Sequence, residues 1–160
     1  MRRITGLILC CILTIRTSAG DDFCGITNST FVNGEQLTFK VFYNVIGIFV
    51  DAGTAIFTVN REHLNNKPVY HIVGAGTSNP TYDWIFKVRD RYETYIDTAT
   101  LKPYKFIRDI NEGGYKKKEN VTFNAETGTA VSTTGVFQVP SCVQDVLSSI
   151  YYARNIDYDK

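Results

Sequence analysis

Few side chains in this sequence are suited to catalysis. The 160-residue chain has two histidines, His63 and His71, and no G-x-S-x-G sequence of the kind that presents a nucleophilic serine. Gly74 and Gly76 form a G-x-G pair that lacks the third glycine of a phosphate-binding turn. His71 lies in a predicted strand, where a packed or half-exposed histidine is more common than a general base. We expect no enzyme and no cofactor, with a hydrolase as the least favoured alternative.

Aromatic side chains indicate a different chemistry, the binding of an apolar ligand. The sequence contains 10 Phe, 10 Tyr and one Trp. On the concave face of a curved sheet, such side chains could hold an acyl chain or another hydrophobic ligand. The alternative is that they fill an ordinary core between sheet and helix, since aromatic residues favour strands. The residues that we expect on the inner face are Phe39, Phe57, Tyr104, Phe106 and Phe123.

Charged residues gather at two places along the chain. Alternation puts Arg89, Arg91 and Glu93 on one face of a strand, which indicates either a docking site for a polar partner or, preferably, a solvated face with cross-strand ion pairs. The run of three lysines at 116–118 either protects a strand end from edge pairing or binds an anionic headgroup. With 17 basic and 16 acidic residues, the chain has no charge excess that would indicate nucleic acid as a partner.

The first twenty residues have the pattern of a signal peptide. A basic start at 1–3 precedes an apolar run at 4–15, and small residues follow at 17–19, where a signal peptidase would cleave. This run is shorter than the roughly 20 apolar residues of a membrane-spanning helix, so an uncleaved anchor is the second interpretation. We expect residues 21–160 to form one periplasmic or secreted β-rich domain without a transmembrane segment.

Two of the four cysteines, Cys24 and Cys142, lie beyond this expected leader. An even number of cysteines in an exported chain indicates a disulfide, here between Cys24 and Cys142. Two reduced, buried thiols are the alternative. The cysteines and histidines do not have the spacing of a metal site, so we expect no bound metal.

The elements that must position these residues are mainly strands. Alternating apolar and polar residues predict strands at 35–46, 53–60, 69–77, 89–96, 104–110 and 129–139, with a bulge or bend near 51–53 and a further strand between turns at 113–114 and 125–128. Pro80 favours one or two helical turns near 80–87. Consecutive strands joined by short turns predict a curved antiparallel meander, open or closed as a half barrel.

The glycine pair Gly113-Gly114 predicts a two-residue hairpin turn and with it a strand register. In this register charged residues face opposite charges and apolar residues face apolar residues, whereas a shift of one residue loses both matches. The expected pairs are Glu112 with Tyr115, Arg108 with Glu119, Asp109 with Lys118, Phe106 with Val121 and Tyr104 with Phe123.

A helix is expected to follow Pro140 and to pack on the sheet. Ser141 and Gln144 have the spacing of a capping box, and Asn155 is a plausible end. The helical period predicts a shared face made of Val143, Val146, Leu147, Ile150 and Arg154.

As a set, several segments of the chain resemble the exported proteins of domain-of-unknown-function family 3108. They are Cys24-Gly25, Gly34-Glu35, the runs at 87–92 and 112–115, and above all the segment at 144–155. The resemblance spans nearly the whole chain beyond the leader and implies a periplasmic, antiparallel β-protein without an established activity. Family members continue past this last helix into more strands, so the resemblance implies that residues 21–160 are the N-terminal part of a longer domain.

Together these features predict a non-enzymatic envelope protein that binds a partner on a curved sheet. The partner would be a lipid or other hydrophobic ligand, or another envelope protein. The alternative is a structural protein-interaction module without a small-molecule ligand.

Overall fold

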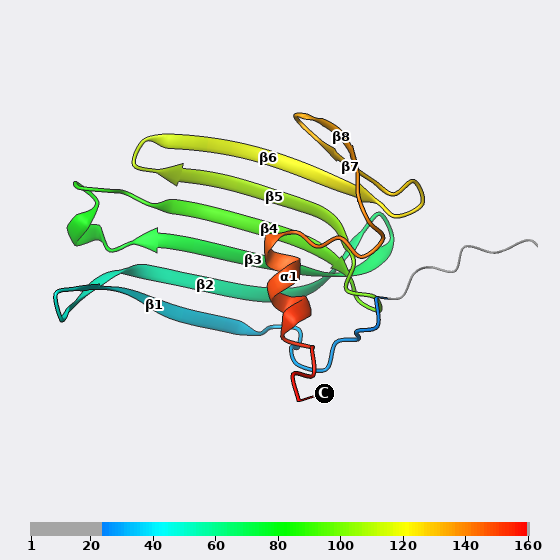
Figure 1. Ribbon diagram of the computed structural model, residues 1–160, viewed down its shortest axis with the longest axis horizontal. Helices are drawn as coiled ribbons and strands as arrows, with labels where there is room; N and C mark the ends of the chain where they lie inside the picture. The colour runs from blue at the N-terminus through cyan, green and yellow to red at the C-terminus, as the bar shows by residue number, and fades with distance from the viewer. Residues whose placement is uncertain (1–23, 160) are drawn as a thin grey trace, which may run out of the picture.

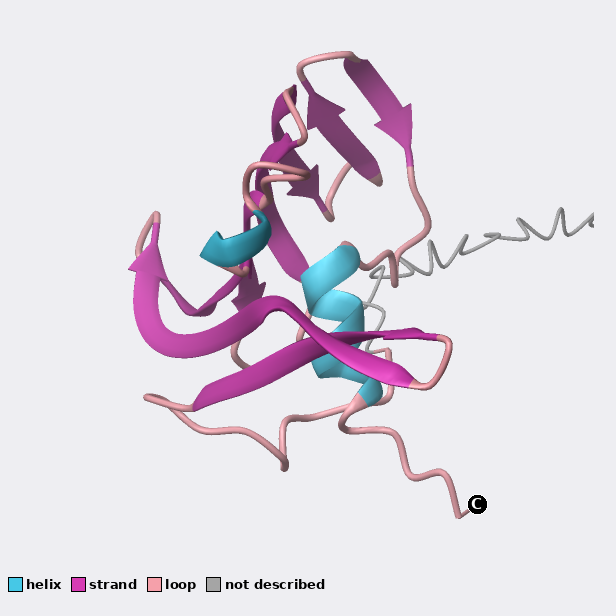
Figure 2. Ribbon diagram, turned by 90° about the vertical axis from the view of Figure 1, so that its left-hand side faces the viewer, coloured by secondary structure: helices cyan, strands magenta, loops and turns pink. Residues whose placement is uncertain are grey.

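The computed structural model describes residues 24–159, which form one open antiparallel sheet and a C-terminal helix (Figure 1). The eight strands follow one another in meander order. They are β1 (Gln36–Val45), β2 (Ile48–Leu64), β3 (Lys67–Ser78), β4 (Arg89–Asp97), β5 (Pro103–Glu112), β6 (Tyr115–Asn124), β7 (Thr129–Ser132) and β8 (Gly135–Gln138), with a 3₁₀ turn η1 (Pro80–Tyr82) and a helix α1 (Val146–Ala153). The sheet curves so that α1 lies on its concave side (Figure 2). The predicted fold class is confirmed.

The expected signal peptide, residues 1–20, lies outside the described residues. Among the residues that are described, no helix is long and apolar enough to span a membrane.

The hairpin of β2 and β3 is longer than predicted, with β2 ending at Leu64 and β3 beginning at Lys67. Two further differences come from local backbone conformation. Ile46 and Gly47 have positive φ angles of 52° and 83°, so they form a tight turn and β2 begins at Ile48. The irregularity expected near 51–53 is a β-bulge, since Val41 pairs with Gly53 and Phe42 pairs with Asp51. The single strand predicted at 129–139 is wrong, because Gly135, at φ 145°, lets the chain reverse between β7 and β8.

The register predicted for the hairpin of β5 and β6 is confirmed. Glu112 pairs with Tyr115 and Arg108 pairs with Glu119, and Gly113 and Gly114 carry the positive φ angles that the turn requires. The predicted pair of Tyr104 and Phe123 is not part of the ladder, because Tyr104 is the extra residue of a bulge between β4 and β5.

Helix α1 begins later than the sequence predicts. Its N-cap is Asp145, whose carboxylate accepts hydrogen bonds from the backbone N–H groups of Leu147 (2.9 Å) and Ser148 (3.0 Å), while Ser148 Oγ accepts from the Asp145 N–H at 2.7 Å. The capping box expected at Ser141 and Gln144 is therefore wrong. The predicted helix face is also wrong, since Val146 and Ile150 are exposed and the buried residues are Leu147, Ser148 and Tyr151.

Asp145 also sets the rotation of α1 on the sheet. Its Oδ2 accepts a hydrogen bond from the hydroxyl of Thr94, on β4, at 2.6 Å. This contact holds the start of the helix on β4 and turns Leu147 and Tyr151 toward the sheet. The helix thus packs on β3 and β4.

The hydrophobic core lies between α1 and the strand ends beneath it. It consists of Phe31, Val59, Tyr70, Ile72, Ile96, Leu101, Leu147 and Tyr151. Phe31, from the segment before β1, places its ring edge-on against Tyr70 and Tyr151 at centroid distances of 5.0 and 4.9 Å. Burying such a side chain contributes about 1.5–3 kcal/mol to the free energy of unfolding, so this cluster is the main source of stability.

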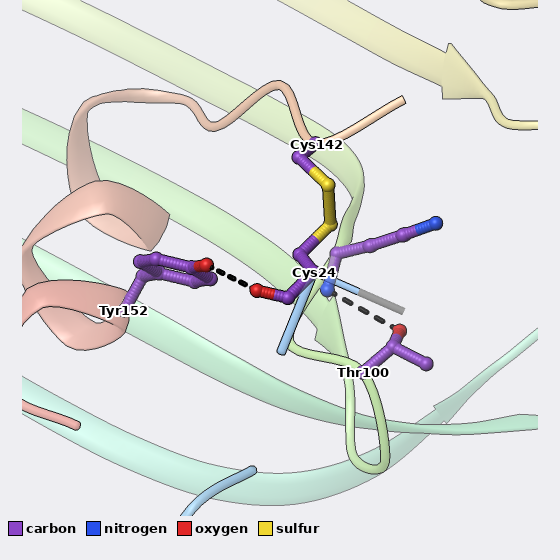
Figure 3. Close-up of a disulfide and its surroundings, with 5 residues drawn as sticks. Cys24, Thr100, Cys142 and Tyr152 are labelled. Carbon is purple, nitrogen blue, oxygen red and sulfur yellow. Dashed lines mark hydrogen bonds between the residues drawn. A yellow bond between two sulfur atoms is a disulfide. The ribbon is translucent and has the colours of Figure 1, made fainter. Parts of the chain in front are cut away.

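A disulfide between Cys24 and Cys142 closes the same end of the molecule (Figure 3). It joins the start of the described chain to the segment that leads into α1, and the Tyr152 hydroxyl donates a hydrogen bond to the Cys24 carbonyl at 2.7 Å. The expected disulfide is confirmed, and it ties the segment before α1 to the start of the described chain.

Candidate functional site

The candidate site lies on the concave face of the sheet, next to α1. One row of paired residues crosses this face beside the helix: Phe57, Gly74, Tyr92, Arg108 and Glu119 are successive neighbours on β2 to β6. A Cβ atom at Gly74 would lie 3.1 Å from Leu147 Cδ2 and 3.2 Å from the Phe57 ring. Only a glycine at this position lets the helix side chain pack so closely on the strand.

Beyond this row, toward the turn between β1 and β2, strands β2 and β3 carry mostly small residues on the concave face. Gly76 pairs with Ala55, and Gly53 pairs with Ser78. A Cβ atom at Gly76 would meet only the Asp90 Cβ, at 3.9 Å, so the space above this glycine is open. We call the strip formed by Gly53, Ala55, Gly74 and Gly76 the trough.

The trough is bordered on the β1 side by apolar residues that remain partly in water. Phe39 and Val41 are 52% and 41% exposed. The Phe39 ring lies edge-on to Phe57, with the two centroids 5.8 Å apart. A hollow of about 150 Å³ opens beside Val41 and Tyr43, above Ala55 and Gly76. Apolar walls above a floor of small residues suit a narrow hydrophobic chain.

The border on the β4 side is more polar. Tyr92 lies beside Phe106, with ring centroids 6.3 Å apart, and the pKa of its phenol is raised, first by burial and then by the charges of Asp90 and Glu112. The pKa of Glu112 is itself raised by a hydrogen bond to Asp90 and by the charge of that carboxylate. The concave face is therefore apolar over β1 to β3 and more polar from β4 onward, although the buried Phe106 also lies there.

Arg108 is the cationic group of the polar half. Its guanidinium forms an ion pair with Glu119, the next residue in the cross-strand row. Its Nε atom is buried and has no hydrogen-bond partner within residues 24–159. Arg108 therefore places a positive charge on this face, and one of its N–H groups is enclosed by the protein without a partner among residues 24–159.

The structure brings only part of the predicted ligand-binding set together. Phe39 and Phe57 lie at the trough, and Phe106 is buried further along the same face. Phe123 lines a small cavity of about 30 Å³ near the segment before α1. Tyr104 points elsewhere, since its bulge directs its hydroxyl to Asp97 Oδ2 at 2.8 Å.

Sequence reasoning missed the residues that make up the floor of the trough. Gly74 and Gly76 were considered only as a phosphate-binding pair, Gly53 only as part of a break between strands, and Ala55 only as a residue of the strand at 53–60. Small residues at every second position of two neighbouring strands are the signal that identifies this floor, because those positions share one face.

The opposite face of the sheet carries an ionic cluster around His71. Its ring nitrogens lie 3.0 Å from a Glu62 carboxylate oxygen and 2.8 Å from a Glu93 carboxylate oxygen, and the ring stacks on Tyr95. Burial raises the pKa of Glu93, but hydrogen bonds from Arg91 and His71 outweigh burial, so the pKa is lowered overall. Both His71 nitrogens are engaged, which fits a cross-strand structural role for this histidine and for the charged strand β4.

Within residues 24–159, no group of three or more His, Cys, Asp and Glu side chains is arranged to hold a metal ion.

Comparisons with known proteins give one match. The model of the family described as "Protein of unknown function (DUF3108)" matches residues 38–160. No curated protein and no solved structure matches the chain.

Proposed function

The chain belongs to the DUF3108 family of proteins of unknown function, and on that premise we propose that it is a non-enzymatic envelope protein that binds a linear apolar ligand, such as an acyl chain, in the trough. One observation carries the proposal: the open part of the concave face has a floor of small residues beside a partly exposed apolar border on β1. Water in such a strip is displaced favourably by an apolar chain.

The dimensions of the trough favour a chain that lies parallel to the strands. Gly74 and Ser78 mark its two ends on β3 and are four residues apart, which corresponds to about 13 Å of strand. Phe39 and Val41 form one side along this length and Tyr92 begins the other. A ligand that covers them gains about 25 cal/mol for each Å² of apolar surface removed from water.

The polar half of the concave face suits the other end of such a ligand. Arg108 follows Tyr92 in the same cross-strand row and has a buried N–H without a partner among the described residues. The Arg108 side chain is 28% exposed, so its positive charge would attract a carboxylate or phosphate at the head of the chain. The favoured ligand is therefore an amphiphile with one apolar tail.

A protein-interaction module without a small-molecule ligand is the second candidate function. Strand β8 favours it, because this four-residue strand is at the edge of the sheet and presents Val136 and Phe137 to solvent. The envelope location common to both candidates depends on the signal peptide expected at residues 1–20.

Blocking the floor of the trough tests the proposal. We expect the protein to bind 11-(dansylamino)undecanoic acid with an increase in dansyl fluorescence, and G76L to weaken this binding at least about tenfold, a loss of about 1.4 kcal/mol. Gly76 does not have a positive φ angle and its Cβ position is open, so the variant should fold. The matched control is T77L, because the side chain of Thr77 lies on the opposite face of β3.

Two results would contradict the proposal. One is an absence of dansyl binding by the unaltered chain. The other is equal affinity of G76L and T77L, which would place the probe elsewhere on the molecule. Thermal unfolding of both variants, followed by circular dichroism, checks that neither result comes from loss of the fold.

A further inference from the structure

The two edges of the sheet differ in length. The β8 edge has four residues, whereas the β1 edge has ten and has β2 as its single neighbouring strand within residues 24–159 (Figure 1). Alternate residues of an edge strand direct their N–H and C=O groups away from the sheet, where another extended backbone can bind them. The β1 edge is therefore a long template for pairing with a further strand.

The β1 edge lacks the features that protect most edge strands. It contains no proline, and the bulge in the β1–β2 ladder adds its extra residue, Ala52, to β2, so the alternation of β1 is unbroken. Lys40 is its single charged residue. Every residue from 38 to 44 is exposed, with Phe42 at 51% on one face and Tyr43 at 67% on the other. A long, apolar and exposed edge of this kind is a site where strands associate.

The sequence of β1 is nearly symmetric about Val41 in chemical class. Aromatic residues lie two positions to either side, Phe39 and Tyr43, and polar residues lie three positions to either side, Thr38 and Asn44. When two copies of this strand pair antiparallel about a two-fold axis at Val41, aromatic residues face aromatic residues and polar residues face polar residues. A two-fold interface requires such self-complementarity, because the same surface serves both partners. A second copy of the chain is thus the partner that this edge fits.

Charge favours this register over the neighbouring one. Paired residues of antiparallel strands lie on the same face, and two self-pairing registers that meet this condition use nearly the whole strand, one centred on Val41 and one on Lys40. The register centred on Lys40 places two lysines opposite each other, which is destabilising. In the other register Lys40 faces Phe42 of the second copy, which pairs with Asp51 of its own β2. That row then runs from an ammonium group across an aromatic ring to a carboxylate.

We propose that β1 pairs antiparallel with β1 of a second copy of this chain, about a two-fold axis at Val41, so that two sheets become one. Ladder hydrogen bonds and facing aromatic side chains hold the two copies together. The two concave faces lie on the same side, and Tyr43 of the second copy lies beside Phe39 at the border of the trough. A contribution of the second copy to ligand binding rests on the function proposed above, whereas the dimer itself does not.

The mass of the purified chain in solution tests the pairing. Sedimentation velocity from micromolar to millimolar concentration should show exchange between one and two copies. Larger species are not expected, because the pairing uses the β1 edge of both copies. No lipid or other ligand is added, so the result is independent of whether the trough binds one.

A charge exchange between two positions of β1 tests the register. F42K places a lysine opposite Lys40 of the other copy at two symmetric positions, so the Kd of the dimer should rise at least about tenfold. K40E/F42K restores opposite charges at both positions and should regain most of this loss. Asp51, which faces position 42 within each chain, is the same in both variants. The matched control V136K changes an exposed apolar residue of the β8 edge and should dimerise as the unaltered chain does.

Four results would overturn the proposal. The first is the mass of a single chain at every concentration, and the second is growth beyond two copies. The third is equal dimerisation of F42K and K40E/F42K, because the two positions would then not face each other. The fourth is a loss of dimer in V136K equal to that in F42K, which would place the interface at the β8 edge. Circular dichroism checks the fold of each variant, which should persist because Phe42 is half exposed.

Discussion

The two ends of the sheet contain similar residue types in opposite surroundings. At the helix end, Phe31, Tyr70 and Tyr151 are almost completely buried and pack edge to face. At the other end, Phe49, Trp84 and Phe86 are more than half exposed. Aromatic content by itself therefore does not separate residues that stabilise this fold from residues available for binding.

The cause of the difference is the short helix and the bonds that hold it. Helix α1 covers only the strand ends near its own packing site on β3 and β4. The disulfide and the Asp145 cap hold it there, and the trough begins where Leu147 ends its contact with Gly74. We conclude that stability is concentrated at the helix end, which leaves the other end free to interact.

Removing the disulfide should give the largest loss of stability at the helix end. The bond joins residues separated by 118 positions, and a loop of that length restricts the unfolded chain by about 5 kcal/mol in the simplest entropy model. We expect C24S/C142S to lose several kcal/mol of unfolding free energy in urea titrations. A loss below about 1 kcal/mol would mean that the disulfide is not important for the stability of the helix end.

Truncation of one core residue should give the next largest effect. Leu147 is almost fully buried against the sheet, so L147A should cost about 3 kcal/mol. Ile85, in the connection between β3 and β4, is exposed, and I85A should change the unfolding free energy by less than about 0.5 kcal/mol. Urea titrations of both variants measure these losses of unfolding free energy. Equal losses would contradict the conclusion that stability is concentrated at the helix end.

The smallest effect is a change in the pH dependence of stability at the helix cap. Burial raises the pKa of Asp145, although hydrogen bonds from Ser148, Thr94 and Leu147 act in the opposite direction. In the unfolded chain the Asp145 carboxyl ionises near pH 4. In the folded chain it ionises at a higher pH. In that range the folded state binds more protons, so stability falls as pH rises from about 4 to the raised pKa.

The variant D145N isolates this contribution. Its amide oxygen can still accept the two backbone hydrogen bonds that cap the helix, but the side chain no longer titrates. We expect the stability of the unaltered chain, relative to D145N, to decline as pH rises above about 4 and then to level off. A relative stability that rises with pH would show that the folded state lowers the Asp145 pKa.

The strand pattern, one turn and the disulfide could be predicted from local sequence. Gly113-Gly114 determines its hairpin because two adjacent positive φ angles are easy only for glycine, and the facing charges then select the register. Cys24 and Cys142 were the two cysteines beyond the expected leader, so their pairing was predicted from their number alone. The boundary at 133–134 was missed, because two short strands and one long strand share the same alternation.

The helix face and the candidate site could not be predicted in the same way. The period of residues 143–154 is compatible with more than one buried face, and the hydrogen bond from Thr94 to Asp145, 51 positions apart, selects the face with Leu147 and Tyr151. Gly53 and Gly76 form one floor only because β2 and β3 pair in a particular register. Tyr104 does not lie with the other predicted ligand-binding residues, because it is the bulged residue of β5 and its side chain points elsewhere.

The sequence by itself determined which segments form strands, because alternation and turn glycines act within a few residues of one another. Only the tertiary structure decided which aromatic residues are covered and which stay in water. That outcome depends on where α1 packs, and its position is set by contacts between residues far apart in the chain, which no local pattern records.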